Sequence, residues 1–196
     1  MKTGILGGTF DPIHQGHLAL ARAAKKQYRL DKILFIPALI PPHKTGRRDM
    51  TPAPYRYRMV EMAISNEPDF EVSDIEFNRP EISYTVETLR DLKKRHPKDE
   101  FFLITGSDTA AEIPGWREPE EIFRMASILV ARRPGFEAGA AAKEIQWIDM
   151  PECPVSSSAI RERLAAGKPA GETMLPPAVE AYIHKMKLYG AGRSCT

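Results

Sequence analysis

Residues 3–36 read TGILGGTFDPIHQGHLALARAAKKQYRLDKILFI, and this stretch decides the fold class. The apolar residues 3–6 predict a short strand that runs into a glycine turn. Residues 16–28 predict a helix, because Leu18, Ala21, Ala24 and Tyr28 recur at a spacing that puts them on one face. The apolar run at residues 32–36 predicts a second buried strand. A strand, a helix and another strand at this spacing indicate a βαβ unit.

The rest of the chain continues the same alternation. Apolar runs predict strands at residues 70–72, 101–105, 127–131 and 145–148, the last as an edge strand. Helical patterns cover residues 85–95, 119–125, 157–166 and 176–187, and Thr51 is the expected N-cap of a further helix that runs to about residue 65. We therefore expect an α/β fold, a Rossmann-like doubly wound parallel sheet flanked by helices. One domain should span residues 1–189, with residues 190–196 as a flexible C-terminal tail.

The overall composition narrows the class of protein. The 196 residues carry 28 Lys and Arg against 26 Asp and Glu, a net charge of +2 that gives no support to nucleic acid or an anionic membrane as partner. No apolar stretch approaches the ~20 residues of a membrane span, and the start has no run of signal-peptide length. Cys153 and Cys195 form neither a metal-ligand spacing nor a disulfide framework, which suits the cytoplasm. Base rates favour a homodimer.

In an open parallel sheet, ligands bind beyond the carboxyl ends of the strands, so the first loop is a candidate site. Its residues Gly7, Gly8, Thr9 and Phe10 match neither GxGxxG nor the P-loop pattern. The physics is related, because paired glycines and a helix N-terminus suit an anion. His14 and His17 are three residues apart and can donate to adjacent phosphate oxygens, more strongly if protonated, while Gly16 leaves room for a bulky group. A surface pair, a helix cap or a metal pair are the alternatives from these residues alone.

This loop resembles the HxGH motif of the nucleotidyltransferase superfamily. The resemblance implies that the loop binds ATP, that His17 contacts the α-phosphate region, and that His14 stabilises the transferring group. Residues 155–161, VSSSAIR, resemble the second superfamily motif, ISSxxIR. They predict a serine-capped helix start, followed by an arginine that can reach the same anion. By resemblance, Ser156, Ser157 and Arg161 hold the β- and γ-phosphates.

Further segments resemble the bacterial nicotinate-nucleotide adenylyltransferases. They are Pro41-Pro42-His43-Lys44, the run SYTVETL at residues 83–89, Gly106-Ser107-Asp108, Trp116, and ARRPG at residues 131–135. The resemblance implies that Lys44, Thr85 and Trp116 bind nicotinate mononucleotide, with Trp116 stacked on the pyridine ring and the helix start at Thr85 receiving the carboxylate. It further implies that Gly106, Asp108 and Arg133 bind ATP. Several family members have tyrosine near position 112, where this chain has Glu112.

The expected activity is transfer of AMP from ATP to nicotinate mononucleotide, giving the dinucleotide and pyrophosphate, with His14, His17, Lys44 and Arg161 as the catalytic residues. The acceptor phosphate is already ionised near neutral pH, since its second pKa is about 6, so no general base is needed. Mg²⁺ is expected on the leaving phosphates, with no dedicated protein ligand. The alternatives are a phosphopantetheine adenylyltransferase, a glycerol-phosphate cytidylyltransferase, and a nucleotide-binding protein without turnover.

Overall fold

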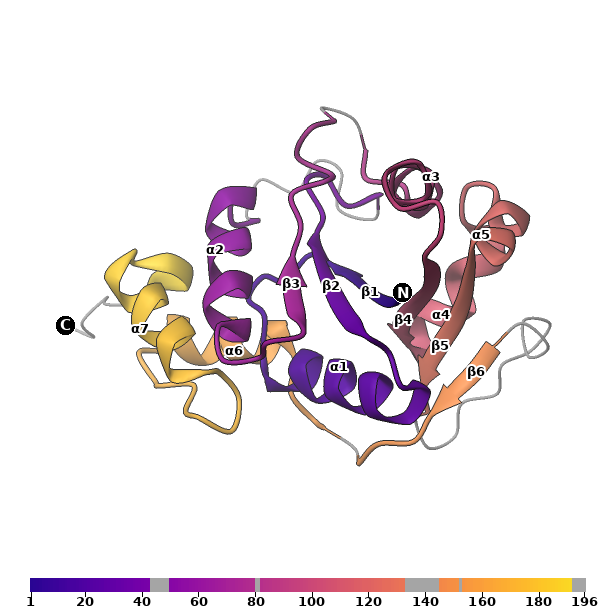
Figure 1. Cartoon of the computed structure of the whole chain (residues 1–196). Helices are drawn as coiled ribbons and strands as arrows, with labels where there is room; N and C mark the ends of the chain where they lie inside the picture. Colours follow the sequence, from indigo (N-terminus) through magenta and orange to yellow (C-terminus); the bar gives the residue numbers. More distant parts are fainter. Residues whose placement is uncertain (43–49, 80–81, 133–144, 152, 192–196) are drawn as a thin grey trace.

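The sheet explains how the chain is organised. The computed structural model describes residues 1–42, 50–79, 82–132, 145–151 and 153–191. Six parallel strands lie in the order β3-β2-β1-β4-β5-β6 (Figure 1). Their bounds are β1 (Lys2–Gly8), β2 (Lys32–Pro37), β3 (Phe70–Val72), β4 (Glu100–Gly106), β5 (Ala126–Ala131) and β6 (Ile145–Ile148). The order reverses at β1, because β2 and β3 continue on one side of it and β4, β5 and β6 on the other.

Helices cover both faces of this sheet (Figure 1). On one face lie α1 (Gln15–Tyr28), α2 (Ala53–Ile64), α6 (Ser157–Ala165) and α7 (Pro177–Lys185), and on the other α3 (Thr85–Arg95), α4 (Ser107–Glu112) and α5 (Pro119–Met125). Successive strand residues alternate between the two cores, so that Leu6 joins the first and Ile5 the second. Both faces of the sheet are therefore covered by helices and shielded from water. This is why the strands are continuous apolar runs.

The structure confirms the predicted fold class and the edge position of β6. Thr51 is not the N-cap of α2, because Pro52 takes that position and no side chain among the described residues caps the helix. Pro54 has no N–H group, so this helix start needs less capping. Thr51 instead donates its N–H to the Asp11 carboxylate and accepts from Arg56.

Short elements were the ones that the sequence did not predict. The six-residue helix α4 and the 3₁₀ turn Ile113–Gly115 follow β4 directly. A second 3₁₀ turn, Leu188–Gly190, precedes Ala191, whose side chain is buried at 3% exposure. The described chain therefore includes the first two residues of the expected tail, and residues 192–196 lie outside the described part. None of the described helices is long and apolar enough to cross a membrane.

Candidate active site

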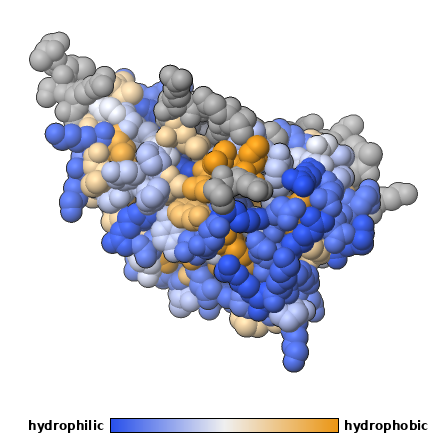
Figure 2. Space-filling model, turned by 90° about the horizontal axis from the view of Figure 1, so that it is seen from above, coloured by the Kyte–Doolittle hydropathy of each residue, from blue (hydrophilic) through white to orange (hydrophobic). Residues whose placement is uncertain are grey.

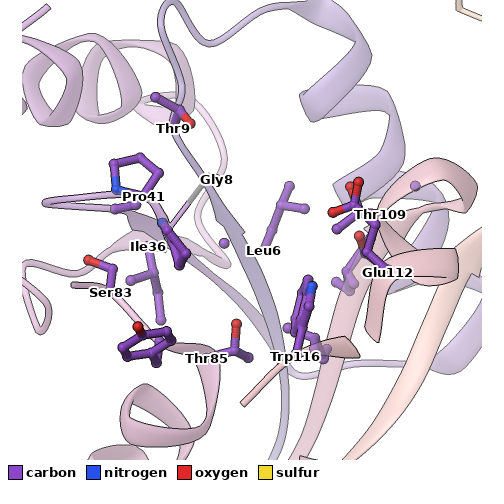
Figure 3. A pocket seen from close by; sticks show the side chains of 18 of the residues that line it. Leu6, Gly8, Thr9, Ile36, Pro41, Ser83, Thr85, Thr109, Glu112 and Trp116 are labelled. Atoms are coloured by element: carbon purple, nitrogen blue, oxygen red, sulfur yellow. The ribbon is translucent and has the colours of Figure 1, made fainter. Parts of the chain in front are cut away.

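A cavity of about 470 Å³ opens at the carboxyl ends of β1, β2 and β4, where the strand order reverses. Thr9 lies at one end, and Thr85 and Trp116 lie at the other (Figure 3). On the face seen from above, hydrophobic residues gather near the centre, and the residues around them are mainly hydrophilic (Figure 2). The site residues expected from the sequence that line the cavity are Gly7, Gly8, Thr9, His17, Thr85, Gly106 and Trp116.

The two histidines form one stacked unit at the start of α1. Their ring centroids are 3.7 Å apart with an interplanar angle of 28°. The His14 backbone N–H donates to Nδ1 of His17 at 3.2 Å. A neutral imidazole whose Nδ1 accepts must carry its proton on Nε2. The fold therefore fixes His17 as an Nε2–H donor beside the glycine-rich loop.

Burial sets the charge of this pair. It lowers the pKa of His14 to about 4. It also lowers the pKa of His17 well below 6.5, and the neighbouring His14 lowers it further. Both rings are thus neutral near pH 7, and each offers one N–H donor.

Gly16 has a different role from the one that the sequence suggested. A Cβ at this position would lie 3.0 Å from both Cε1 and Nδ1 of His14. The space above Gly16 is occupied by the His14 ring itself, so it is not free for a ligand. Gly16 therefore permits the histidine stack to form.

The second motif packs directly against the first loop. The Ser157 hydroxyl donates to the Pro12 carbonyl at 2.9 Å, and Nη1 of Arg161 donates to the Asp11 carbonyl at 2.8 Å. Tyr189 contacts the same loop, because its hydroxyl donates a hydrogen bond to the Asp11 carboxylate at 2.7 Å. Segments about 150 residues apart in sequence therefore meet within a few residues of the histidine stack.

Helix starts supply donors at both ends of the site. Ser156 is the N-cap of α6 and accepts from the Ala159 N–H at 3.2 Å. No side chain caps α3, whose first residue, Thr85, lines the cavity. Among the described residues, the backbone N–H groups of Thr85 and Val86 have no hydrogen-bond acceptor and remain available to an anion, whereas the Glu87 N–H donates to the Tyr84 carbonyl at 3.1 Å.

Trp116 forms the other wall beside Thr85. It packs against the core on the α3 side of the sheet, and its indole Nε1 is buried with no hydrogen-bond partner among the described residues. Arg117, which the sequence reasoning did not single out, also lines the cavity and stacks over the Tyr84 ring at 5.0 Å. This end of the cavity therefore combines a flat aromatic surface with a cation.

Some expected residues lie apart from the cavity. The Phe10 side chain is in the core at 2% exposure, so only its backbone can reach a nucleotide. Asp108 is exposed in the first turn of α4 and does not line the cavity. Lys44 and Arg133 fall outside the described residues.

Arg56 and Glu76 are buried charged residues that the sequence reasoning missed. Arg56 is 0% exposed, and its guanidinium donates only to backbone carbonyls among the described residues. Glu76 lines the cavity and accepts from the Thr88 hydroxyl at 2.7 Å, and burial raises its pKa. A signal for Arg56 was present, because it falls in register with Met59, Val60 and other buried positions of α2.

Comparison with known proteins agrees with this geometry. Residues 5–163 match the cytidylyltransferase-like family. A Desulfitobacterium hafniense protein named "Probable nicotinate-nucleotide adenylyltransferase" is 41% identical, covering 96% of this chain and 95% of that protein. A Bacillus pumilus protein of the same name is 43% identical, covering 96% of this chain and 98% of that protein.

The chain belongs to the nicotinate-nucleotide adenylyltransferase family.

The fold of this adenylyltransferase also occurs in a solved structure, "Plasmodium falciparum nicotinic acid mononucleotide adenylyltransferase complexed with NaAD". The TM-score is 0.79 at 23% identity, and the match covers 99% of this chain and 100% of that chain. The described residues of this family member contain no group of three or more His, Cys, Asp or Glu side chains that could hold a metal ion.

Proposed function

We propose that this protein transfers AMP from ATP to nicotinate mononucleotide, releasing pyrophosphate and forming nicotinate adenine dinucleotide. The observation that carries the proposal is the junction of Ser157 and Arg161 with the loop at Asp11 and Pro12. This junction brings the start of α6, the start of α1 and the glycine-rich loop together at the point where the strand order reverses. Relatives more than 40% identical over nearly the whole chain carry the name of this activity.

The donor nucleotide would occupy the side formed by the β1 loop, α1 and α6. His17 would donate its Nε2–H to the α-phosphate, with His14 stacked beside it to stabilise the transferring group. Ser156, Ser157 and Arg161 would hold the β- and γ-phosphates. The backbone at Gly7, Gly8, Thr9 and Phe10 would border the triphosphate. Gly106 would border the adenosine inside the cavity, with Asp108 reaching it from outside the cavity in the first turn of α4 and Arg133 as a further contact.

The acceptor would occupy the side formed by α3 and the turn at Trp116. The indole would stack on the pyridine ring, and the uncapped N-terminus of α3 at Thr85 would receive the carboxylate. A neutral carboxamide gains less from a positive helix end, so the acid should be preferred to the amide. Lys44 would bring a cation to the phosphates from its loop.

The reaction follows from this arrangement. A phosphate oxygen of nicotinate mononucleotide attacks the α-phosphorus of ATP and forms a new P–O bond. The bond between the α-phosphorus and the oxygen bridging to the β-phosphate breaks, and its electron pair leaves with pyrophosphate. No proton has to be removed from the attacking oxygen, so positioning and charge neutralisation are the main tasks. Mg²⁺ would arrive bound to ATP as part of the substrate.

A panel of acceptors tests the proposal. Purified protein is incubated with Mg-ATP and nicotinate mononucleotide, nicotinamide mononucleotide or phosphopantetheine, and pyrophosphate release is measured. We expect release with the nicotinate compound at the highest kcat/KM. Release with phosphopantetheine alone would identify the alternative adenylyltransferase, and binding of ATP without release would support a non-catalytic nucleotide-binding protein. Equal kcat/KM for acid and amide would contradict the carboxylate site at α3.

The setting of the reaction is also a proposal. We infer that the enzyme works in the cytoplasm, since its two cysteines suit a reducing compartment. A homodimer without nucleic acid or membrane partners is proposed as the working form. Sedimentation velocity with and without substrates would test the assembly.

A further inference from the structure

Arg56 lies behind the wall of the cavity and is completely buried. It extends from α2, and its guanidinium contacts three separate segments. Nη1 donates to the Thr9 carbonyl at 2.6 Å, and Nη2 donates to the carbonyls of Ala38 at 2.7 Å and Leu39 at 3.3 Å. Nε donates to the Thr51 carbonyl at 2.8 Å. All four contacts use backbone carbonyls as acceptors. The planar guanidinium therefore fixes the backbone of these segments, whatever side chains the acceptor residues carry.

Two of these contacts belong to opposite halves of the proposed site. Thr9 is in the glycine-rich loop on the ATP side. Ala38 follows β2 in the segment that leads to the acceptor side, because the next N–H group, that of Leu39, donates to the Ser83 hydroxyl just before α3 at 3.1 Å. Both Thr9 and Ala38 line the cavity. The β1–β2 ladder ends at the pair Gly8 and Pro37, and the Ala38 N–H donates to the Gly8 carbonyl at 2.9 Å. Beyond this point the segments that follow β1 and β2 leave the sheet. Arg56 continues the link between them where strand pairing has stopped.

The charge of Arg56 also bears on the site. Burial lowers its pKa, but an arginine remains protonated in proteins. Its direct acceptors in the described chain are neutral carbonyls, while Asp11, Tyr189 and Glu76 act on it electrostatically. A cation with no bonded carboxylate among the described residues, directly behind a wall of the cavity, contributes positive potential to a site whose two substrates are both anions.

We propose that Arg56 is a positioning residue that fixes the spacing between the ATP loop and the acceptor loop, so that the attacking oxygen and the α-phosphorus are held in line. The inference rests on the proposed function. A lysine at this position keeps the charge but has a single nitrogen, which cannot span carbonyls of two loops with a planar fork. The ATP side and the acceptor side would then each still bind its substrate, but the distance between the two loops would no longer be fixed.

The test uses Arg56→Lys with two controls from the same helix. Arg58→Lys changes an exposed arginine that pairs with Glu61, and Val60→Ala removes buried volume at another position of α2. Calorimetry measures Kd for a non-hydrolysable Mg-ATP analogue, for nicotinate mononucleotide, and for the dinucleotide product, which spans both halves. Steady-state assays give kcat and KM at a temperature well below every Tm.

We expect Arg56→Lys to weaken product binding about tenfold and lower kcat about 10- to 100-fold, with each substrate Kd within about threefold of wild type. Val60→Ala should lower Tm yet keep product affinity and kcat within about twofold, and Arg58→Lys should change neither. Product affinity in Arg56→Lys equal to that in Val60→Ala would overturn the inference. Weakening of all three ligands in parallel would overturn it as well, since that pattern indicates general loss of structure.

Folding is monitored by circular dichroism, with Arg56→Gln as a second variant. If neither variant folds, the positioning role is rejected in favour of a purely structural one. The product-binding comparison is independent of turnover. A wild-type protein that releases no pyrophosphate would therefore count against the proposed function, and the ratio of product affinities would still decide the role of Arg56.

Discussion

At the scale of single residues, the neutral His17 with its proton on Nε2 is the feature closest to the proposed chemistry. We expect His17→Ala to lose about 2–4 kcal/mol of transition-state stabilisation, because a preorganised hydrogen-bond donor is removed. This loss corresponds to a decrease of about 30- to 1000-fold in kcat/KM. Steady-state kinetics measure this loss. The exposed His184→Ala is the matched control. A kcat/KM near the wild-type value in His17→Ala would remove His17 from the mechanism.

The buried His14 should also make the free energy of unfolding depend on pH. Its pKa is about 4 in the fold against 6.5 for a free imidazole, so the unfolded chain takes up the proton first on acidification. The free energy of unfolding should therefore decrease as pH falls from about 6.5 to about 4, and less steeply in His14→Asn. Urea titrations across this range measure both slopes. An NMR titration of His14 with a midpoint near 6.5 would contradict the prediction.

At the scale of elements, the central strand β1 depends on a glycine that faces the core. A Cβ at Gly4 would lie 2.6 Å from Cδ1 of Ile33, 2.8 Å from that of Ile104 and 2.9 Å from that of Leu30. We expect Gly4→Ala to lower the free energy of unfolding by ~1–3 kcal/mol through overpacking. Gly7→Ala in the same strand, where nothing described lies within 4 Å, should leave it nearly unchanged. Urea denaturation compares the two, and equal stability would argue that the core has room at Gly4.

At the scale of the whole molecule, Arg161 joins α6 to the first loop across 150 residues of sequence. We expect Arg161→Gln to weaken binding of a non-hydrolysable Mg-ATP analogue about tenfold, because a charged donor to the phosphates and a loop anchor are both lost. The rise in Tm that saturating analogue produces should shrink accordingly. Arg163→Gln is the control, since its guanidinium donates to Pro169, in the loop after the helix. Equal affinity in both variants would contradict the proposed triphosphate site.

Predictability from sequence followed the strength of local patterns. The strands and the long helices were predictable because their apolar periodicity extends over many residues, as in Leu18, Ala21 and Ala24 of α1. The six-residue helix α4 was missed because it is too short for a period to show. Thr51 was misassigned because a cap depends on where its side chain points, and here its backbone serves Asp11 and Arg56.

The candidate site was predictable only in part. The segments expected to bind phosphate were identified by their resemblance to two family motifs, and the structure brings these segments together at Asp11 and Pro12. Arg56 was missed because an arginine within a helix is usually solvated, and only the enclosing loops show that it is buried. The space expected above Gly16 is filled by His14, a contact that depends on a side-chain rotamer.

The amino-acid sequence by itself determined the order of strands and helices, the parallel α/β class and the two motifs, because these depend on local spacing and residue type. Only the tertiary structure decided that both histidines are neutral, which nitrogen of His17 keeps its proton, and that one buried guanidinium joins the loops of β1 and β2. The physical reason is that burial and hydrogen-bond direction depend on segments far apart in the chain, whose positions are fixed only when the sheet and its helices pack together.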